Sequence, residues 1–367
     1  MKVLITGSNG FIGRNLEVYL CKKNINILTF NRKDPIKKLY DNLLKSDVIC
    51  HIAGENRPLD PNLFFINNTL LTKKICDFLL KKKKKIKIIF TSTTQVSKNN
   101  LYSKSKKKCE NILLDYKKKT NANISILRLP NVFGKWSKPN YNSVIATFCY
   151  NISRTMKIRV FNRKESVNLI YIDDVILQIY KLLKNLDKNT FPKILNIKRI
   201  KVSRVAEKIQ DFKKNINTQY LNILESKLDK DLYSTFISFL PKKNFFTNIK
   251  SNRDDRGNFA EFIKSENYGQ ISFFSIKKNK ERGGHFHNSK VEKFLIIRGS
   301  AKIFYRNLHN DSFFTKRITE NNLKIFHSIP GWVHTIKNIG KIDLIGIVWA
   351  NEIFDKKRPD TYKYIDA

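Results

Sequence analysis

The sequence predicts two domains of different classes, an α/β domain with a doubly wound parallel sheet and, after it, an all-β domain. Up to about residue 180, apolar strand-like runs alternate with stretches of helical length, which is the pattern of a parallel sheet covered by helices. A lysine-rich helical stretch then ends at Pro241, and after about residue 250 short strands follow one another with turn residues between them. We therefore expect one domain over residues 1–245 and another over residues 246–367.

The apolar runs place the strands of each domain. In the first domain they are 3–6 (VLIT), 26–30 (NILTF), 47–53 (DVICHIA), 87–92 (KIIFTS) and 124–130 (ISILRLP). In the second domain they are 269–276 (GQISFFSI), 293–299 (KFLIIRG), 301–307 (AKIFYRN), 324–331 (KIFHSIPG), 334–340 (HTIKNIG) and 343–350 (DLIGIVWA). Strands separated by helices suit a parallel sheet, whereas short strands joined directly by turns suit an antiparallel sandwich or barrel.

The composition is that of a globular protein. A chain of 367 residues with 41% hydrophobic residues can bury two cores. No window approaches 18 uncharged apolar residues, so we expect a cytoplasmic protein without membrane association. The cysteines show no C-x-x-C spacing, and we expect reduced packing residues at all five positions: Cys21, Cys50, Cys76, Cys109 and Cys149.

The charge is strongly basic, with 71 basic and 31 acidic residues and a net value of +40. Such a charge can indicate nucleic-acid binding. Here the lysines are dispersed among many Asn and Ile residues, and the sharpest cluster, 81–85, falls where lysines suit a helix C-terminus. We expect a solvated surface that favours an anionic substrate and no nucleic-acid partner; a basic nucleic-acid-binding protein is kept as an alternative.

A glycine-rich turn follows the first strand. In VLITGSNGFIGRNL, Gly7, Gly10 and Gly13 stand between a strand and a helix. Glycines there let backbone amides approach a pyrophosphate at the helix N-terminus, where the helix dipole favours an anion. The motif predicts a dinucleotide site, with an ordinary glycine-rich strand-helix turn as the alternative.

The residues after the second strand favour NADPH over NADH. Phe30 is followed by Asn31, Arg32 and Lys33, so no acidic residue stands at the strand tip to hold a free ribose 2′-hydroxyl. Arg32 can pair with a 2′-phosphate instead.

A Tyr and a Lys at helical spacing follow the fourth strand. Tyr102 and Lys106 lie four residues apart, so they share a helix face, and an ammonium beside a phenol lowers the phenol pKa toward the range useful for proton transfer. A hydroxyl at the end of the preceding strand, from Thr93 or, as the second choice, Ser92, can hold a substrate carbonyl.

Residues 1 to about 180 resemble the extended short-chain dehydrogenase/reductase family, which has a Rossmann-type fold. The motifs TGSNGFIG, DVICHIAG, YSKSK, RLPNVFG and YIDDV occur in the family's order. The resemblance implies that Tyr102 donates or accepts the proton, that Lys106 orients the nicotinamide ribose, and that Thr93 holds the substrate carbonyl. Val167 stands near the place where many relatives carry an arginine for the substrate pyrophosphate. The expected cofactor-binding residues are Gly7, Gly10, Phe11, Ile12, Gly13, Arg32 and Lys106.

The stretch HFHNSKVEKFLIIRG predicts a metal site in the second domain. His285 and His287 are two residues apart, so they point to the same face of a strand, and Glu292 follows after a turn-length gap. A later strand supplies His334. Three imidazoles and a carboxylate inside a barrel suit zinc or another first-row divalent metal. Of the remaining histidines, His51 and His309 are expected to be packing or surface residues, and His327 is ambiguous.

These residues resemble the two motifs of the cupin (jelly-roll) fold, with Gly284 directly before His285 as a departure at the entry turn. The longer stretches GGHFHNSKVEKFLIIRG, PGWVHTIKNIG and VWANEIFDKKRPDTY, together with AGENRP in the first domain, resemble a family of bifunctional capsular polysaccharide synthesis enzymes. In these enzymes an extended short-chain reductase precedes a zinc cupin.

The resemblance implies the reaction. In that family the cupin epimerises C3 of a UDP-2-acetamido-2,6-dideoxy-4-hexulose, and the reductase then uses NADPH to reduce C4, giving UDP-N-acetyl-6-deoxy-L-talosamine, a step toward UDP-N-acetyl-L-fucosamine for capsule or O-antigen. The implied cofactors are NADPH and Zn²⁺ or another divalent metal, and the expected state is a homodimer. Two enzyme alternatives remain: a nucleotide-sugar 4-epimerase that keeps NAD bound, and a reductase whose cupin is a dimerisation module without chemistry.

Overall fold

The structure, a computed structural model, describes residues 1–58, 60–184 and 189–364. The chain forms two compact units. One consists of Met1–Gln210 with Leu224–Pro241, and the other consists of Asp211–Ile223 with Lys242–Ala367. The expected boundary at residue 245 stays a prediction, and each unit is described below by itself.

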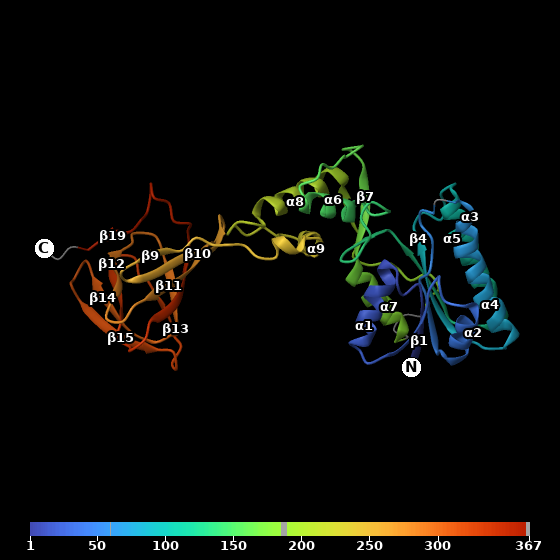
Figure 1. Cartoon of the computed structure of the whole chain (residues 1–367), viewed down its shortest axis with the longest axis horizontal. Coiled ribbons are helices and arrows are strands. Elements are labelled where there is room, and N and C mark those ends of the chain that lie inside the picture. Colours follow the sequence, from blue (N-terminus) through green and yellow to red (C-terminus); the bar gives the residue numbers. More distant parts are fainter. Residues whose placement is uncertain (59, 185–188, 365–367) are drawn as a thin grey trace. The chain divides into compact units, whose positions relative to one another are not determined.

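The first unit contains a parallel sheet of five strands in the order β2-β1-β3-β4-β5 (Figure 1). The strands are β1 (Lys2–Thr6), β2 (Asn26–Phe30), β3 (Val48–His51), β4 (Lys87–Thr93) and β5 (Ile124–Leu129). This order reverses between β1 and β3, which is the topological switch point where doubly wound sheets bind ligands. The predicted sheet is therefore confirmed, and the glycine turn after β1 lies at its switch point.

Helices cover both faces of this sheet. The helical elements are α1 (Phe11–Cys21), α2 (Ile36–Lys45), α3 (Asn62–Phe64), the π-helical turn η1 (Phe65–Leu70), α4 (Leu71–Lys81), α5 (Leu101–Thr120) and α7 (Ile172–Leu183). Alternate strand residues point to opposite faces, so Leu4 packs with α2, α4 and α5, whereas Val3 and Ile5 pack with α1 and α7. Apolar side chains thus fill two layers, and the polar groups gather at the strand ends.

A smaller sheet and three helices complete the first unit and the segment after it. The sheet has the order β6-β7-β8, with β6 (Asn131–Phe133), β7 (Ser166–Tyr171) and β8 (Lys198–Lys201). The helices are α6 (Val144–Ser153), α8 (Val202–Asn215) and α9 (Lys227–Ser238), followed by the 3₁₀ turn η2 (Lys242–Asn244). The lysine-rich stretch is therefore two helices, because Gln219 and Leu221 between them form backbone hydrogen bonds with Lys264, and all three residues belong to the second unit.

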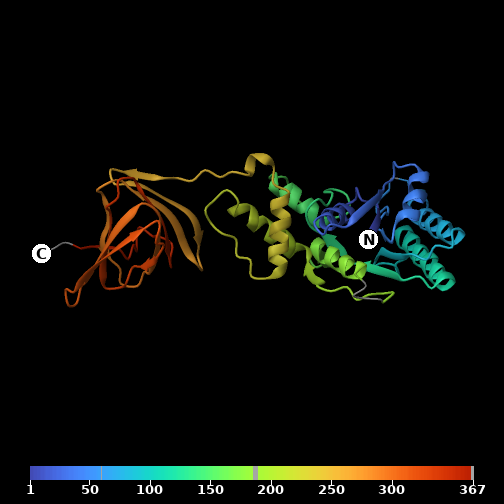
Figure 2. The ribbon, with the colours of Figure 1, turned by 90° about the horizontal axis from the view of Figure 1, so that it is seen from below.

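The second unit consists of two antiparallel sheets packed face to face (Figure 2). One has the order β16-β13-β18-β11-β10-β9 and the other β15-β14-β17-β12-β19. The strands are β9 (Asn252–Asp254), β10 (Gly257–Ser265), β11 (Gly269–Ile276), β12 (Glu281–Phe286), β13 (Glu292–Arg298), β14 (Ser300–Asn307), β15 (Phe313–Thr319), β16 (Ile325–His327), β17 (Trp332–Asn338), β18 (Leu344–Ala350) and β19 (Tyr362–Lys363). Buried residues of both sheets, among them Phe294 and Ile336, form one core, so the predicted all-β class is confirmed.

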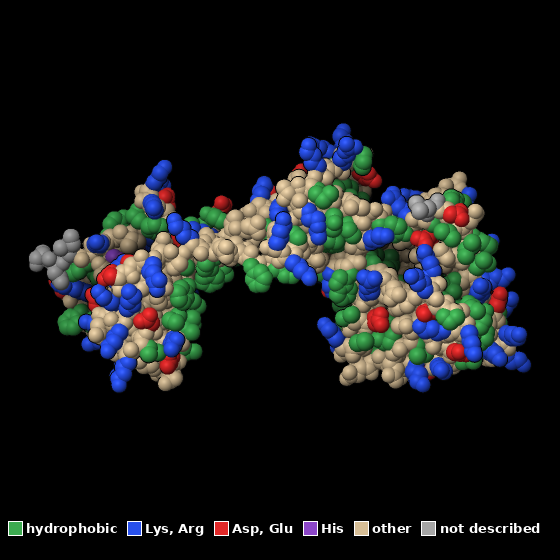
Figure 3. All heavy atoms as spheres, viewed as in Figure 1, with side chains coloured by type: hydrophobic (Ala, Val, Ile, Leu, Met, Phe, Trp, Pro, Cys, Tyr) green, Lys and Arg blue, Asp and Glu red, His purple; other side chains and the backbone are tan. Residues whose placement is uncertain are grey.

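The surface agrees with a dispersed charge. Lys and Arg side chains are scattered over both units on the face shown in Figure 3 and do not gather in a single patch. Across the described residues, no helix combines the length and apolarity needed to cross a bilayer. The cysteines are free thiols, and all except Cys21 are buried, as expected of packing residues.

Candidate nucleotide site and candidate metal centre

Two positions of the glycine turn, Gly7 and Gly13, are packed too tightly for a side chain. Gly7 has a φ of +75°, and a Cβ added there would lie 2.8 Å from Cα of Ala53. A Cβ on Gly13 would lie 2.2 Å from the carbonyl oxygen of Gly7. The glycines therefore let α1 approach the ends of β1 and β3 closely.

The N-terminus of α1 is available to an anion. Its N-cap is Gly10, which offers no side-chain cap, so the amides at Phe11 and Ile12 begin the helix without a side-chain partner at the cap. With the dipole at this end of the helix, the turn has the backbone and the electrostatics to hold a pyrophosphate. The predicted residues Gly7, Gly10, Phe11, Ile12 and Gly13 thus lie together at the switch point of the sheet.

Arg32 lies at the same edge and already has an anionic partner. Its guanidinium forms an ion pair with the carboxylate of Glu55. Arg32 follows β2 and Glu55 follows β3, on either side of β1, so the pair crosses the edge at which the glycine turn begins. Glu55 is buried, whereas the Arg32 side chain is 69% exposed. A 2′-phosphate that binds Arg32 would therefore have to compete with the Glu55 carboxylate for the guanidinium.

Tyr102, Lys106 and Thr93 come together at the ends of β4 and α5. Tyr102 lies in the first turn of α5 and forms a side-chain hydrogen bond with Thr93, the last residue of β4. Lys106, one turn later, donates from Nζ to the carbonyl oxygen of Thr91 at 2.9 Å. Ser92 instead donates to the buried carboxylate of Glu110 at 2.7 Å, so of the two candidate hydroxyls only Thr93 contacts the phenol.

Burial controls the protonation of this group. It raises the pKa of Tyr102 to about 12, against a smaller opposing effect of the Thr93 hydrogen bond. The expectation that Lys106 lowers the phenol pKa is therefore wrong. The reason is geometric, because the ammonium is bonded to the carbonyl of Thr91 and burial lowers its own pKa. Lys106 nevertheless lies at the switch point, since a Cβ on Gly54 would be 2.9 Å from Nζ.

Two polar residues of this site escaped the sequence reasoning. Asn68, in the π-helical turn η1, donates to Ser105 Oγ at 3.0 Å and accepts from the Glu55 amide at 2.6 Å, which ties α5 to the segment after β3. Tyr141, in the loop after β6, donates to Glu55 Oε1 at 2.8 Å. Neither residue belongs to a local sequence motif. Their common partner, Glu55, lies in the stretch AGENRP, which indicates a family resemblance but no role for Glu55.

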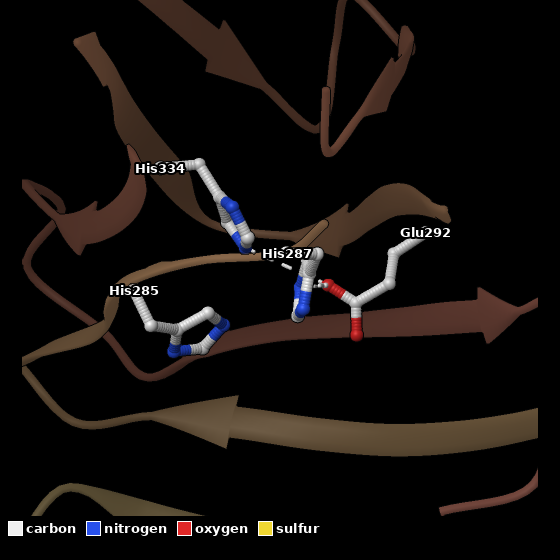
Figure 4. Close-up of side chains that lie close together, drawn as sticks. All are labelled: His285, His287, Glu292 and His334. Atoms are coloured by element: carbon white, nitrogen blue, oxygen red, sulfur yellow. Dashed lines mark hydrogen bonds and ion pairs between the residues drawn. The ribbon is translucent and has the colours of Figure 1, made fainter. Parts of the chain in front are cut away.

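The four predicted metal ligands converge inside the second unit. His285, His287, Glu292 and His334 each offer one ligand atom, and these atoms lie within 4.8 Å of one another (Figure 4). His285 and His334 are register partners on β12 and β17, with a bulge between Gly283 and His285. His287 follows β12 directly, and Glu292 begins β13. We call these residues the four-residue cluster.

The chemistry of the cluster fits a divalent metal. His287 Nε2 lies 3.1 Å from Glu292 Oε2, and His334 Nε2 lies 3.5 Å from the same oxygen (Figure 4). Although burial disfavours the charged form of Glu292, the hydrogen bonds from His287 and His334 lower the pKa of Glu292 to about 2. Burial lowers the pKa of His285 to about 4. At neutral pH the cluster therefore offers a carboxylate and an unprotonated imidazole, the forms that bind zinc.

The other histidines lie outside the cluster. His51 is buried, and its ring nitrogens contact Thr6 Oγ1 at 2.8 Å and Thr72 Oγ1 at 2.9 Å, so it is a satisfied core residue, as expected. His309 is exposed in a turn. His327 is exposed on β16. Val167 lies on β7 as the register partner of Ile200, in a strand without a basic residue.

Comparison with known proteins places both units in known families. Residues 3–197 match the NAD dependent epimerase/dehydratase family, and residues 252–362 match the polysaccharide biosynthesis C-terminal domain. A Pseudomonas aeruginosa protein, UDP-2-acetamido-2,6-beta-L-arabino-hexul-4-ose reductase, is 38% identical over 364 residues, which are 99% of this chain and 98% of that protein.

Solved structures give the same result. The capsular polysaccharide assembling protein CapF from Staphylococcus aureus matches with a TM-score of 0.93 and 36% identity, covering 100% of both chains. The protein RMD from Pseudomonas aeruginosa, solved with NADPH, matches 65% of this chain and 97% of its own with a TM-score of 0.55 and 17% identity, which is a likeness of fold alone.

Proposed function

Because the chain belongs to the NAD dependent epimerase/dehydratase family and carries a polysaccharide biosynthesis C-terminal domain, we propose that it is a bifunctional nucleotide-sugar enzyme of capsule or O-antigen synthesis. Its second unit, a cupin, epimerises C3 of a UDP-2-acetamido-2,6-dideoxy-4-hexulose. Its first unit then reduces C4 with NADPH, and the product is UDP-N-acetyl-6-deoxy-L-talosamine.

One observation carries this proposal. The similarity to the Pseudomonas aeruginosa reductase, which is named for a 4-keto sugar, extends over 99% of the chain and so includes both units. Each unit also contains its own polar centre, Tyr102 with Lys106 and Thr93 in the first and the four-residue cluster in the second. A protein that performed only a reduction would not require the second centre.

The reductase residues have complementary tasks. NADPH, when bound, supplies the hydride that adds to C4. The C4 oxygen then requires a proton, and Tyr102 holds one at neutral pH because its pKa is raised. Thr93, already hydrogen-bonded to the phenol, can hold the carbonyl oxygen within reach of that proton. The positive charge of Lys106, beside Gly54 at the switch point, suits the cofactor ribose, and Arg32 suits the 2′-phosphate.

The order of the two reactions follows from the chemistry of the ketone. The C4 carbonyl makes the proton on C3 acidic, so its removal and return on the other face invert C3. Reduction of C4 removes the ketone, and this route is then closed. Epimerisation therefore precedes reduction, and the reductase fixes the configuration that the cupin has set.

A divalent metal would be held by His285, His287, Glu292 and His334. Bound there, it would polarise an oxygen of the substrate or stabilise the barrel. The cluster itself contributes a neutral His285 imidazole and the Glu292 carboxylate in a partly buried site, so it would favour an anionic enolate form of the sugar only while a cation is present.

Product analysis tests the proposal. We expect the purified protein, incubated with the UDP-4-keto sugar and NADPH, to oxidise one NADPH per sugar and to yield a product whose proton NMR couplings show inversion at C3 and a new hydroxyl at C4. NADPH oxidation with C3 retained would reduce the activity to that of a simple reductase. Absence of NADPH oxidation would exclude the proposed reaction.

A further inference from the structure

The C-terminal segment 359–364 is attached to β12, the strand that carries His285 and leads directly to His287. β19 pairs with β12, with His285 opposite Lys363 and Phe286 opposite Tyr362. The Tyr364 amide donates to the Gly284 carbonyl at 2.9 Å. We call residues 359–364 the C-terminal strap. It covers the backbone at which the cluster begins.

The strap makes a direct contact with a cluster imidazole. The carbonyl oxygen of Asp360 lies 2.6 Å from His287 Nδ1. A carbonyl can only accept a hydrogen bond, so Nδ1 carries the proton and donates it. Nε2, which lies 3.1 Å from Glu292 Oε2, is then the nitrogen whose lone pair a metal would use once Nε2 has given up its proton. The contact fixes the tautomer and the ring orientation that a metal ligand requires.

The side chain of Asp360 holds this carbonyl in place. Its carboxylate accepts from the backbone amides of Asn288 at 3.0 Å, Ser289 at 2.9 Å and Lys290 at 2.7 Å, and from Ser289 Oγ at 2.9 Å. Burial opposes ionisation, but these hydrogen bonds outweigh it and lower the pKa of this carboxyl. The turn that they fix, 288–290, links His287 to Glu292 along the chain.

The backbone of Asp360 is strained, which indicates that its position is imposed by these contacts. Its φ is +37°, a left-handed backbone conformation that residues other than glycine adopt only at an energetic cost. Lys290 adds support on both sides, because its buried ammonium donates to the Pro359 carbonyl and to Thr361 Oγ1 at 3.1 Å. The contacts of residues 288–290 with residues 359–361 thus hold the Asp360 carbonyl oxygen in place.

We infer that Asp360 is a positioning residue of the metal centre: through its carboxylate it fixes the 288–290 turn, and through its carbonyl it holds His287 with Nε2 directed into the cluster. This rests on the proposed metal centre. The C-terminal strap is therefore part of the outer shell of the site, although Asp360 lies 73 residues from the ligand that it supports.

The test is the metal affinity of the full-length Asp360→Ala variant. We expect Zn²⁺ to bind about 10–100-fold more weakly than in the wild type, the usual scale for a lost outer-shell partner, in a titration against a chromophoric chelator. The absorption bands of the Co²⁺-loaded variant should shift as well, because they report the ligand geometry. Asp355→Ala is the matched control, since Asp355 caps a turn of the same segment by accepting from the Lys357 amide at 2.9 Å.

The outcomes distinguish the role of Asp360 from the existence of the metal centre. A wild type that binds no metal would overturn the metal centre itself. A wild type that binds metal, with an equal affinity and an unchanged Co²⁺ spectrum in Asp360→Ala, would overturn the inference alone, as would an equal loss in Asp355→Ala. If Asp360→Ala does not fold, Asp360→Asn, which keeps the size and one acceptor oxygen, must show a smaller loss of affinity than tenfold but the same direction.

Discussion

At the scale of single residues, the Tyr102 phenol and the Lys106 ammonium have different hydrogen-bond partners. Tyr102 is bonded to Thr93, whereas Lys106 is bonded to the Thr91 carbonyl and lies 4.7 Å from the centre of the Phe90 ring. Burial raises the pKa of Tyr102 to about 12, so the phenol is protonated at neutral pH. It is therefore a proton donor at neutral pH, which is the form that reduction of a ketone needs.

The first prediction concerns this proton. Tyr102→Phe removes the donor but keeps the ring, so NADPH binding should persist while the turnover number of the reductase falls about 10²-fold or more. Binding is measured by fluorescence titration and turnover by NADPH oxidation. Oxidation at a near-normal rate in this variant would remove Tyr102 from the mechanism.

The second prediction concerns cofactor choice. Arg32→Ala should weaken NADPH binding by about 2 kcal/mol, the order of a charge-assisted hydrogen bond, and leave NADH binding nearly unchanged. Glu55→Gln removes the carboxylate that Arg32 now contacts. Because Arg32 is largely exposed, this pair contributes little, and NADPH should bind at most about fivefold more tightly in Glu55→Gln.

Isothermal titration with both cofactors measures these effects. Equal losses for NADPH and NADH in Arg32→Ala would show that Arg32 does not contact the 2′-phosphate. Weaker NADPH binding in Glu55→Gln would show that Glu55 positions Arg32 for the cofactor rather than competing with it.

The site residues that the sequence predicts lie close together along the chain, whereas those that it misses contact residues far away in the sequence. Tyr102 and Lys106 are four apart, and His285 and His287 are two apart, so spacing alone places each pair. Glu55 contacts Tyr141 across 86 residues, and His287 contacts Asp360 across 73. No periodicity encodes such contacts, because they depend on how the loops meet in the folded chain.

At the scale of elements, α5 is anchored at its middle by a buried carboxylate. Glu110 is fully buried and accepts from Arg128 of β5 at 2.6 and 3.0 Å and from Ser92 of β4 at 2.7 Å. One turn before it stands Lys106, and two turns before it stands Tyr102. This ion pair therefore fixes the helix that carries both residues to the strands that end at the site.

The third prediction tests that anchor. Arg128→Ala leaves Glu110 buried without its cation and should lower the free energy of opening of the first unit by about 2 kcal/mol, below the 3–5 kcal/mol of fully buried pairs because the Arg128 side chain is 38% exposed. Hydrogen exchange of the β4 and β5 amides measures this free energy.

The control is Arg204→Ala, which removes an exposed i,i+3 pair with Glu207 and should change the same free energy by less than about 0.5 kcal/mol. Equal effects of the two substitutions would contradict the anchoring role of Glu110.

The elements that sequence patterns predicted are those with continuous apolar runs. All five strands of the parallel sheet have such runs, since both of their faces are buried. β12, with the sequence ERGGHF, has no apolar run because it consists of two charged residues, two glycines, the candidate ligand His285 and one phenylalanine, and β19 is only two residues long. β15 escaped because its side chains are mostly exposed. The sequence predicts one helical stretch before Pro241, because no sequence pattern indicates that residues 219–221 pair with Lys264 through their backbone.

At the scale of the whole molecule, two separately built units carry two chemistries that must act in order. Tyr102, Lys106 and Thr93 lie at the ends of β4 and α5 in the first unit, and the four-residue cluster lies in the second unit, which consists of two antiparallel sheets. The division predicts that each chemistry can be removed without the other. His287→Ala should release the metal and loosen the second unit, because an incomplete ligand set no longer holds the metal, while NADPH binding by the first unit persists.

The most direct test of this division is the incorporation of deuterium at C3 of the UDP-4-keto sugar in D₂O, measured by NMR without NADPH. The wild type and Tyr102→Phe should both exchange the C3 proton, whereas His287→Ala, folded but metal-free, should not; His287→Ala should still reduce an already epimerised ketone when NADPH is supplied. Unchanged exchange in metal-free His287→Ala, or loss of exchange in Tyr102→Phe, would contradict two independent sites.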